Sequence, residues 1–156
     1  MDTNSVGDRG GNVVLSKAAL NGSIVGTGAL NVANNVTFVI DGVFNTVAAN
    51  NNVAFSSGHT ALAAGCACLF ALWVNSVGTF STTQGGIVDT ASLSAGTGQK
   101  VIPLPASIAD NALVGLVKVK TAGAATFTPG TTNCNATNVT CTFYDTSRMP
   151  TEPYTS

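Results

Sequence analysis

Four cysteines come closest, by type and spacing, to a chemical site in this chain of 156 residues. Cys66 and Cys68 stand two apart in GCACLF, and Cys134 and Cys141 flank NATNVT. A structural metal site needs paired C-x-x-C spacing or nearby histidines, and this pattern provides neither. We favour small buried side chains as the interpretation of these cysteines. A disulfide between Cys134 and Cys141 across a hairpin is the alternative.

The other titratable residues form no catalytic pattern. His59, the single histidine, could act as a general base, although a loop residue with local hydrogen bonds is the favoured interpretation. A glycosidase needs two carboxylates at a set separation, and Asp89 and Asp110 stay open as such a pair. No G-x-S-x-G nucleophile motif occurs. We therefore expect a protein that is not an enzyme and has neither a cofactor nor a metal.

Charge is scarce throughout the chain. Charged residues make up 8% of the sequence, against about 25% in ordinary soluble domains. The net charge is −1 without a run of Lys or Arg, which disfavours nucleic acid as a partner. The longest uncharged apolar stretch, Ala61–Val74, is too short for a bilayer span, so we expect no membrane partner. A surface with few ions to desolvate favours packing against a neighbour, and we expect an oligomer.

The first residues, MDTNSVGDRGGN, contain no apolar core of a signal peptide. We therefore expect either a product of the cytoplasm or a chain whose signal peptide has been removed. Four Asn-x-Ser/Thr sequons, at Asn21, Asn35, Asn135 and Asn138, matter only in a secretory pathway, so we expect them to be unmodified.

Alternating hydrophobic patterns predict an all-β protein, an antiparallel β-sandwich or jelly-roll-like domain. Residues 1–34 are rich in glycine and asparagine and predict an extended N-terminal arm, with strand pieces near Val13–Leu15 and Ser23–Val25. Residues 35–146 form the expected β-sandwich core, in which Asp41-Gly42 predicts a hairpin turn. Residues 147–156 form the expected short C-terminal tail.

Two segments carry the strongest strand patterns. Cys66–Asn75 is apolar on both faces and predicts a strand that is covered on both sides. Leu69, Leu72 and Trp73 in this strand are the candidates for a core or an oligomer interface. From Leu113 the residues alternate, so that Leu113, Gly115, Val117 and Val119 share one face of a strand and Val114, Leu116, Lys118 and Lys120 share the other.

Four segments between Val36 and Pro150 follow one another in a distinctive order. They are VTFVIDGVFNT, HTALAAGCACLFALWVNSVGTFSTTQGG, ALVGLVKVKTAGAATFTPGTT and VTCTFYDTSRMP. As a series they resemble tailed-phage virion structural proteins of the capsid decoration, or cement, type. Cys134 and Cys141 depart from that pattern, which has ordinary polar or small residues at these places.

The resemblance implies a protein of the virion, made in the host cytoplasm, that binds the outer head surface and stabilises contacts between major capsid protein subunits. Its implied partners are the major capsid protein and further copies of itself, as a homotrimer at a three-fold position. The alternative is a head or tail fibre or receptor-binding component that contacts host surface glycans. The aromatic residues Phe38, Phe44, Phe70 and Trp73 fall in predicted strands rather than in loops, which favours the first hypothesis. A secreted adhesin is a third hypothesis.

Overall fold

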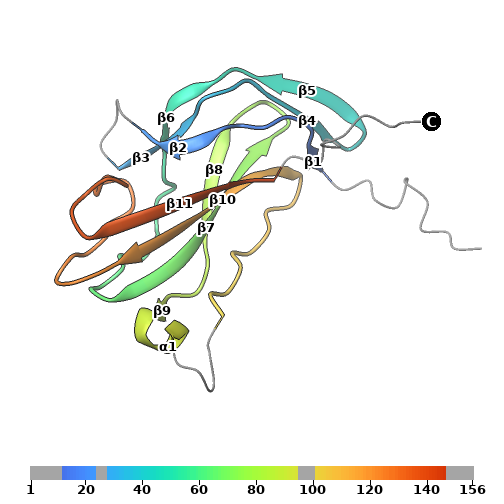
Figure 1. Cartoon of the computed structure of the whole chain (residues 1–156). Helices are drawn as coiled ribbons and strands as arrows, with labels where there is room; N and C mark the ends of the chain where they lie inside the picture. Colours follow the sequence, from blue (N-terminus) through green and yellow to red (C-terminus); the bar gives the residue numbers. More distant parts are fainter. Residues whose placement is uncertain (1–11, 24–27, 95–100, 147–156) are drawn as a thin grey trace, which may run out of the picture.

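The chain folds as an all-β antiparallel sandwich, as the sequence predicted (Figure 1). The computed structural model describes residues 12–23, 28–94 and 101–146. Within these ranges, one short helix, α1 (Thr90–Ser94), accompanies the strands, and no helix is long and apolar enough to cross a membrane. The jelly-roll connectivity stays a prediction.

The larger layer of the sandwich is a five-stranded sheet built around its longest strands. Its order is β11-β10-β7-β8, and a short strand, β9, pairs with the start of β7. The strands are β7 (Cys66–Asn75), β8 (Phe80–Gln84), β9 (Val88–Asp89), β10 (Asn111–Thr121) and β11 (Val139–Asp145). β7 has the bounds that the sequence predicted.

The opposite layer consists of two three-stranded sheets, ordered β1-β4-β5 and β2-β3-β6, which lie above the larger sheet in Figure 1. The strands are β1 (Val13–Val14), β2 (Leu20–Gly22), β3 (Ala29–Val32), β4 (Val36–Ile40), β5 (Val43–Val47) and β6 (Asn50–Ala54). Asp41 and Gly42 connect β4 to β5 with φ values of 51° and 76°. Positive φ at both central residues is the signature of a type I′ hairpin turn, which confirms the predicted hairpin.

The core lies between the two layers. Phe38 from β4 and Phe70 from β7 are fully buried there, together with Phe127. Phe55 links the aromatic cluster, since its ring centroid lies 5.0 Å from that of Phe70 and 5.9 Å from that of Phe127, both in edge-on contact. Such edge-to-face pairs add to the stabilisation from burial alone.

The structure differs from the expected N-terminal arm. β1 pairs with β4, β3 pairs with β6, and Val14, Leu30 and Val32 are buried in the core. Each strand is too short to show a periodicity, and its partner is distant in sequence, so the pattern alone could not reveal the pairing. Residues 1–11, most of the expected strand near Ser23–Val25, and the expected tail at 147–156 lie outside the described residues.

A β-bulge corrects the predicted faces of β10. The register between β10 and β7 shifts between Leu113 and Gly115, which reverses the alternation there. As a result Val114 is buried in the core, whereas Leu113 is half-buried on the opposite face. Beyond the bulge, Val117 and Val119 share one face, as predicted, and both belong to the core.

Because of the bulge, we expect a polar substitution to destabilise the protein strongly at Val114 and only weakly at the neighbouring Leu113. Val114→Asn places an amide in the core without partners and should lower the free energy of unfolding by about 3 kcal/mol or more. Leu113→Asn lies on the outer face and should cost about 1 kcal/mol. Urea denaturation of both variants at one protein concentration checks this ranking, and a reversed order would mean that β10 runs without the bulge.

Candidate functional site

The outer face of β7, which points away from the core, carries apolar side chains. Ala71 and Trp73 are buried on this face, with Trp73 8% exposed, and Leu69 is half-buried. Leu72, the third residue that the sequence singled out, points the other way and belongs to the core cluster. Both faces of β7 are therefore covered. Part of the cover over the outer face comes from another segment of the same chain.

That cover is an extended segment, residues 101–110, which precedes β10. Its Pro103 lies against Gly85, where an added Cβ would come 2.3 Å from the Pro103 carbonyl oxygen. Trp73 Nε1 donates to Thr83 Oγ1 at 2.9 Å. The Thr83 hydroxyl in turn donates to the carbonyl oxygen of Ala106 at 2.9 Å, which anchors the segment over the outer face.

The segment leaves part of this face open. Between the segment and the sheet lies a hollow of about 270 Å³, here called the outer hollow, lined by Ala71, Trp73, Leu104, Pro105, Leu113 and Leu116. Leu104 in this lining is 72% exposed, and Val101, at the start of the same segment, is 83% exposed. None of the lining side chains carries a charge or a polar group apart from the Trp73 indole. Covering this surface would therefore cost little desolvation.

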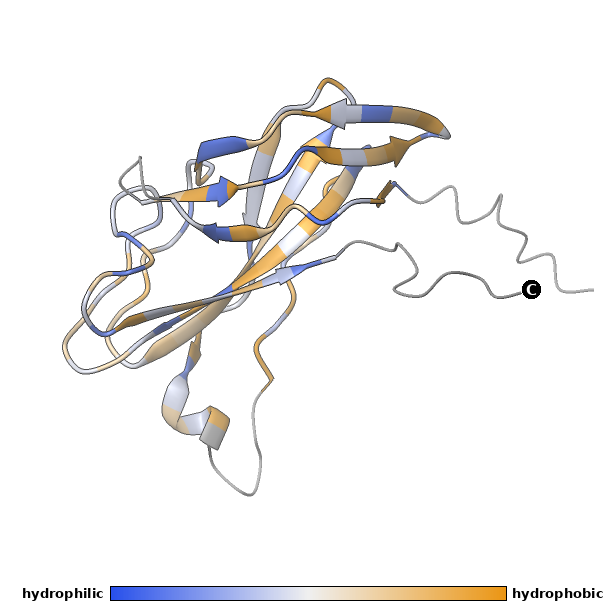
Figure 2. Ribbon diagram, turned by 45° about the horizontal axis from the view of Figure 1, so that its top comes forward, coloured by the Kyte–Doolittle hydropathy of each residue, from blue (hydrophilic) through white to orange (hydrophobic). Residues whose placement is uncertain are grey.

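The tip of the β4–β5 hairpin is a second exposed apolar feature. Val43 is 60% exposed and Phe44 is 72% exposed, directly after the Asp41–Gly42 turn. The hairpin extends to one end of the upper layer, and the strand ends next to its turn are coloured as hydrophobic in Figure 2. Burial of an exposed aromatic side chain against a partner is favourable in free energy, so the hairpin tip is a candidate site of contact with another protein.

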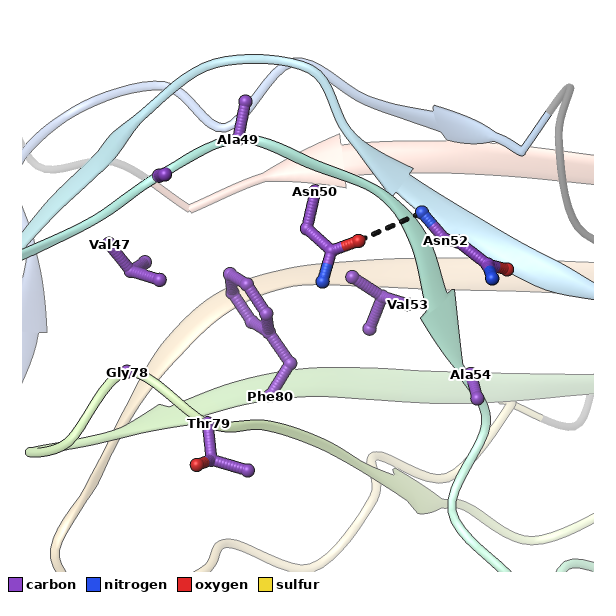
Figure 3. A pocket seen from close by; sticks show the side chains of 10 residues that line it. Val47, Ala49, Asn50, Asn52, Val53, Ala54, Gly78, Thr79 and Phe80 are labelled. Atoms are coloured by element: carbon purple, nitrogen blue, oxygen red, sulfur yellow. Dashed lines mark hydrogen bonds between the residues drawn. The ribbon is translucent and has the colours of Figure 1, made fainter.

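A hollow of about 480 Å³, with a mostly apolar lining, lies between β6 and the start of β8 (Figure 3). Asn50 and Phe80 point into it from opposite sides, and Asn50 Oδ1 accepts the backbone N–H of Asn52 at 2.9 Å. A neighbouring hollow of about 380 Å³ shares Asn50 and adds Asn31 and Asn51. We call the two together the asparagine hollows, and no charged side chain lines either of them.

The cysteines fall into two settings. Cys68 is buried on β7, where burial raises the pKa of its thiol and its Sγ donates to the carbonyl oxygen of Gly85 at 3.2 Å. Cys134 and Cys141 are free thiols that lie side by side and hydrogen-bond to each other. The disulfide considered from the sequence requires this proximity. Their bridging stays a prediction.

His59 and the acids have structural surroundings. The Nε2 atom of His59 shares a 2.8 Å hydrogen bond with Thr82 Oγ1, and its ring packs edge-on against Phe70. Asp89 Oδ1 accepts the N–H of Ala91 at the start of α1. Asp110 occupies a left-handed turn (φ 54°) before β10. Among the described residues, no three metal-ligating side chains gather at one place.

Comparison with known proteins adds no assignment. The chain matches no protein-family model, and no curated protein and no solved structure is similar to it. The case for a function therefore rests on the surfaces described above. The sequence indicated Leu69 and Trp73, but it did not indicate residues 101–110 as their cover. The prolines at 103 and 105 predicted an extended segment without saying where it lies.

The setting of His59 predicts a pH-dependent stability. Burial lowers the pKa of His59, so the folded state takes up a proton less readily than the unfolded chain. The free energy of unfolding should therefore fall as the pH drops through about 6.5, the ordinary pKa of histidine. His59→Gln removes the titration, and urea denaturation at about pH 7.5 and about pH 5.5 should show a smaller loss for this variant. Equal losses in both proteins would contradict the prediction.

Proposed function

We propose that this chain is a capsid decoration, or cement, protein of a tailed phage, which binds the outer head surface and stabilises contacts between major capsid protein subunits. The observation that carries the proposal is the uncharged apolar surface of the outer hollow, whose Leu104 is exposed, as is Val101 at the start of the same segment. The order of sequence segments between Val36 and Pro150 supports it. The protein acts by binding alone, without catalysis.

The outer hollow is the surface through which copies of the chain associate. Val101 is exposed at the start of the segment whose Leu104 and Pro105 line the outer hollow, so this segment offers a protruding apolar side chain as well as a cavity. When this side chain enters the cavity of a neighbouring copy, the contact is head-to-tail, and such contacts form a ring where the rotation between copies closes. The ring that fits a three-fold position of a phage head is a homotrimer.

The hairpin tip is the contact with the head. Phe44 and Val43 stand free at the end of the β4–β5 hairpin, away from the outer hollow. Burial of one such side chain contributes about 1.5–3 kcal/mol. A trimer presents three tips at once, so that weak single contacts add up through their effective concentration. Separation of the capsid subunits would then require loss of these contacts.

A second candidate function is a head or tail fibre or receptor-binding component. The observation that favours it is the pair of asparagine hollows, because amide groups both donate and accept hydrogen bonds and can meet the hydroxyls of a neutral glycan. Phe80 in the same hollow offers an apolar ring face to a sugar.

The mass in solution tests the proposed self-association. Light scattering should give three times the chain mass of 15.6 kDa for the wild type. Val101→Ser and Leu104→Ser, at exposed positions that the fold does not need, should shift the protein toward the monomer. Val77→Ser is the matched control, since Val77 is 82% exposed in the β7–β8 turn and does not line the outer hollow. A monomeric wild type, or equal effects of all three changes, would contradict this interface.

Co-sedimentation tests the binding itself. The probe is empty heads assembled from the major capsid protein encoded in the same genome. The wild type should bind and raise the temperature at which the heads come apart, and Phe44→Ser should weaken binding about tenfold or more. Val77→Ser should bind as the wild type does. If the wild type failed to bind heads but bound a host-glycan array, the second candidate would replace the first.

A further inference from the structure

Two consecutive turns fold the chain back so that Cys134 meets Cys141. The N–H of Ala136 donates to the carbonyl oxygen of Asn133 at 3.1 Å, and the N–H of Val139 donates to that of Ala136 at 3.0 Å. The second turn leads directly into β11, which carries Cys141 opposite Val119 of β10. The two thiols hydrogen-bond to each other.

The surroundings hold this pair in place without sealing it. Both cysteines are half-buried and pack against the core cluster together with Phe143. The Cβ of Cys134 lies 3.1 Å from the point where a Cβ on Gly22 would stand, so the loop runs close beneath β2. A small reagent can therefore reach the sulfur atoms, while the backbone around them is fixed.

We propose that Cys134 and Cys141 form a redox-sensitive pair that closes into a disulfide on exposure to a low-molecular-weight disulfide such as oxidised glutathione. The Cys134 thiolate attacks one sulfur of the reagent, whose S–S bond breaks and releases one thiolate. Cys141 then attacks the mixed disulfide at the sulfur of Cys134, its proton passes to the departing thiolates, and a second reagent thiol leaves. The protein loses two protons and two electrons, and the reagent gains them.

The two thiols are unequal in a way that suits these roles. The hydrogen bond with Cys141 lowers the pKa of Cys134, which favours its thiolate. The same hydrogen bond, together with burial and the neighbouring negative charge, raises the pKa of Cys141. Since the thiolate is the attacking species, Cys134 reacts first and Cys141 resolves the intermediate.

Closure ties the two layers of the sandwich together. Asn133, next to Cys134, accepts the N–H of Gly28 through Oδ1 at 2.7 Å, just before β3. A Cβ on Gly28 would come 2.3 Å from the backbone nitrogen of Thr131, so the loop and this turn are in close backbone contact. A bond from Cys134 to Cys141 therefore fixes β11, in one layer, to a loop that is anchored on the other. Oxidising surroundings close the bond and reducing surroundings open it.

The test uses the full chain, first reduced and then incubated with oxidised glutathione. Intact mass should fall by two hydrogen atoms without a glutathione adduct, and peptide mapping should find Cys134 joined to Cys141. The melting temperature should rise by about 5–10 °C, because the bridge restricts the unfolded chain. A reducing agent should reverse both changes.

Three variants complete the experiment. Cys134→Ser and Cys141→Ser should each abolish the rise in melting temperature. Cys141→Ser should instead keep a glutathione adduct on Cys134, whereas Cys134→Ser should form little adduct, because burial still raises the pKa of the Cys141 thiol. Cys66→Ser, which also removes a half-buried cysteine, should respond as the wild type does. A lasting adduct on the wild type, a bridge that involves Cys66 or Cys68, or a bridged protein that melts no higher than the reduced one would each overturn the proposal.

Discussion

The structure depends on one constraint, which is that β7 has two apolar faces and both must be kept from water. Its core face, with Phe70 and Leu72, organises the sandwich against the opposite layer. Its outer face, with Ala71 and Trp73, requires a second cover, and residues 101–110 provide it. A single extended segment is narrower than the strands beneath it. The outer hollow and the exposed Leu104 follow from that difference in width, so the proposed association surface is a consequence of how β7 is buried.

Polar interactions in this protein are made almost without charge. Between Lys17 and Asp89, Asp41 is the only formally charged residue. Hydroxyl and amide groups take over the role that ion pairs have elsewhere. Thr121, which is fully buried, donates its hydroxyl to the carbonyl oxygen of Ala63 at 2.7 Å and accepts the N–H of Cys66 at 3.0 Å. No buried side-chain nitrogen or oxygen of the described residues lacks a hydrogen-bond partner. Such groups can be covered by another protein at a lower desolvation cost than ions.

Local chemistry made part of this fold predictable from the sequence. The bounds of β7 follow from its apolar run, and the β4–β5 turn follows from Asp41-Gly42. The contribution of residues 12–23 and 28–34 to the core was not predictable, because β1 and β3 depend on distant partners rather than on their own pattern. At the candidate site, the sequence indicated Trp73, whereas its cover depends on a close approach of Pro103 to Gly85 that no local pattern encodes. The assignment to a phage head remains a proposal, since it rests on the resemblance and on surface chemistry.

The two-sided burial of β7 also sets a kinetic hazard during synthesis. β7 is complete at Asn75, but its neighbour β10 ends only at Thr121. At about 5–20 residues per second, translation of the intervening chain takes roughly 2–9 s. During that interval β7 exposes ten residues without a single charge, on an edge that another nascent chain can also pair with. The yield of folded protein therefore depends on whether β10 or another chain pairs with β7 first, and a low concentration of nascent chains favours the native partner.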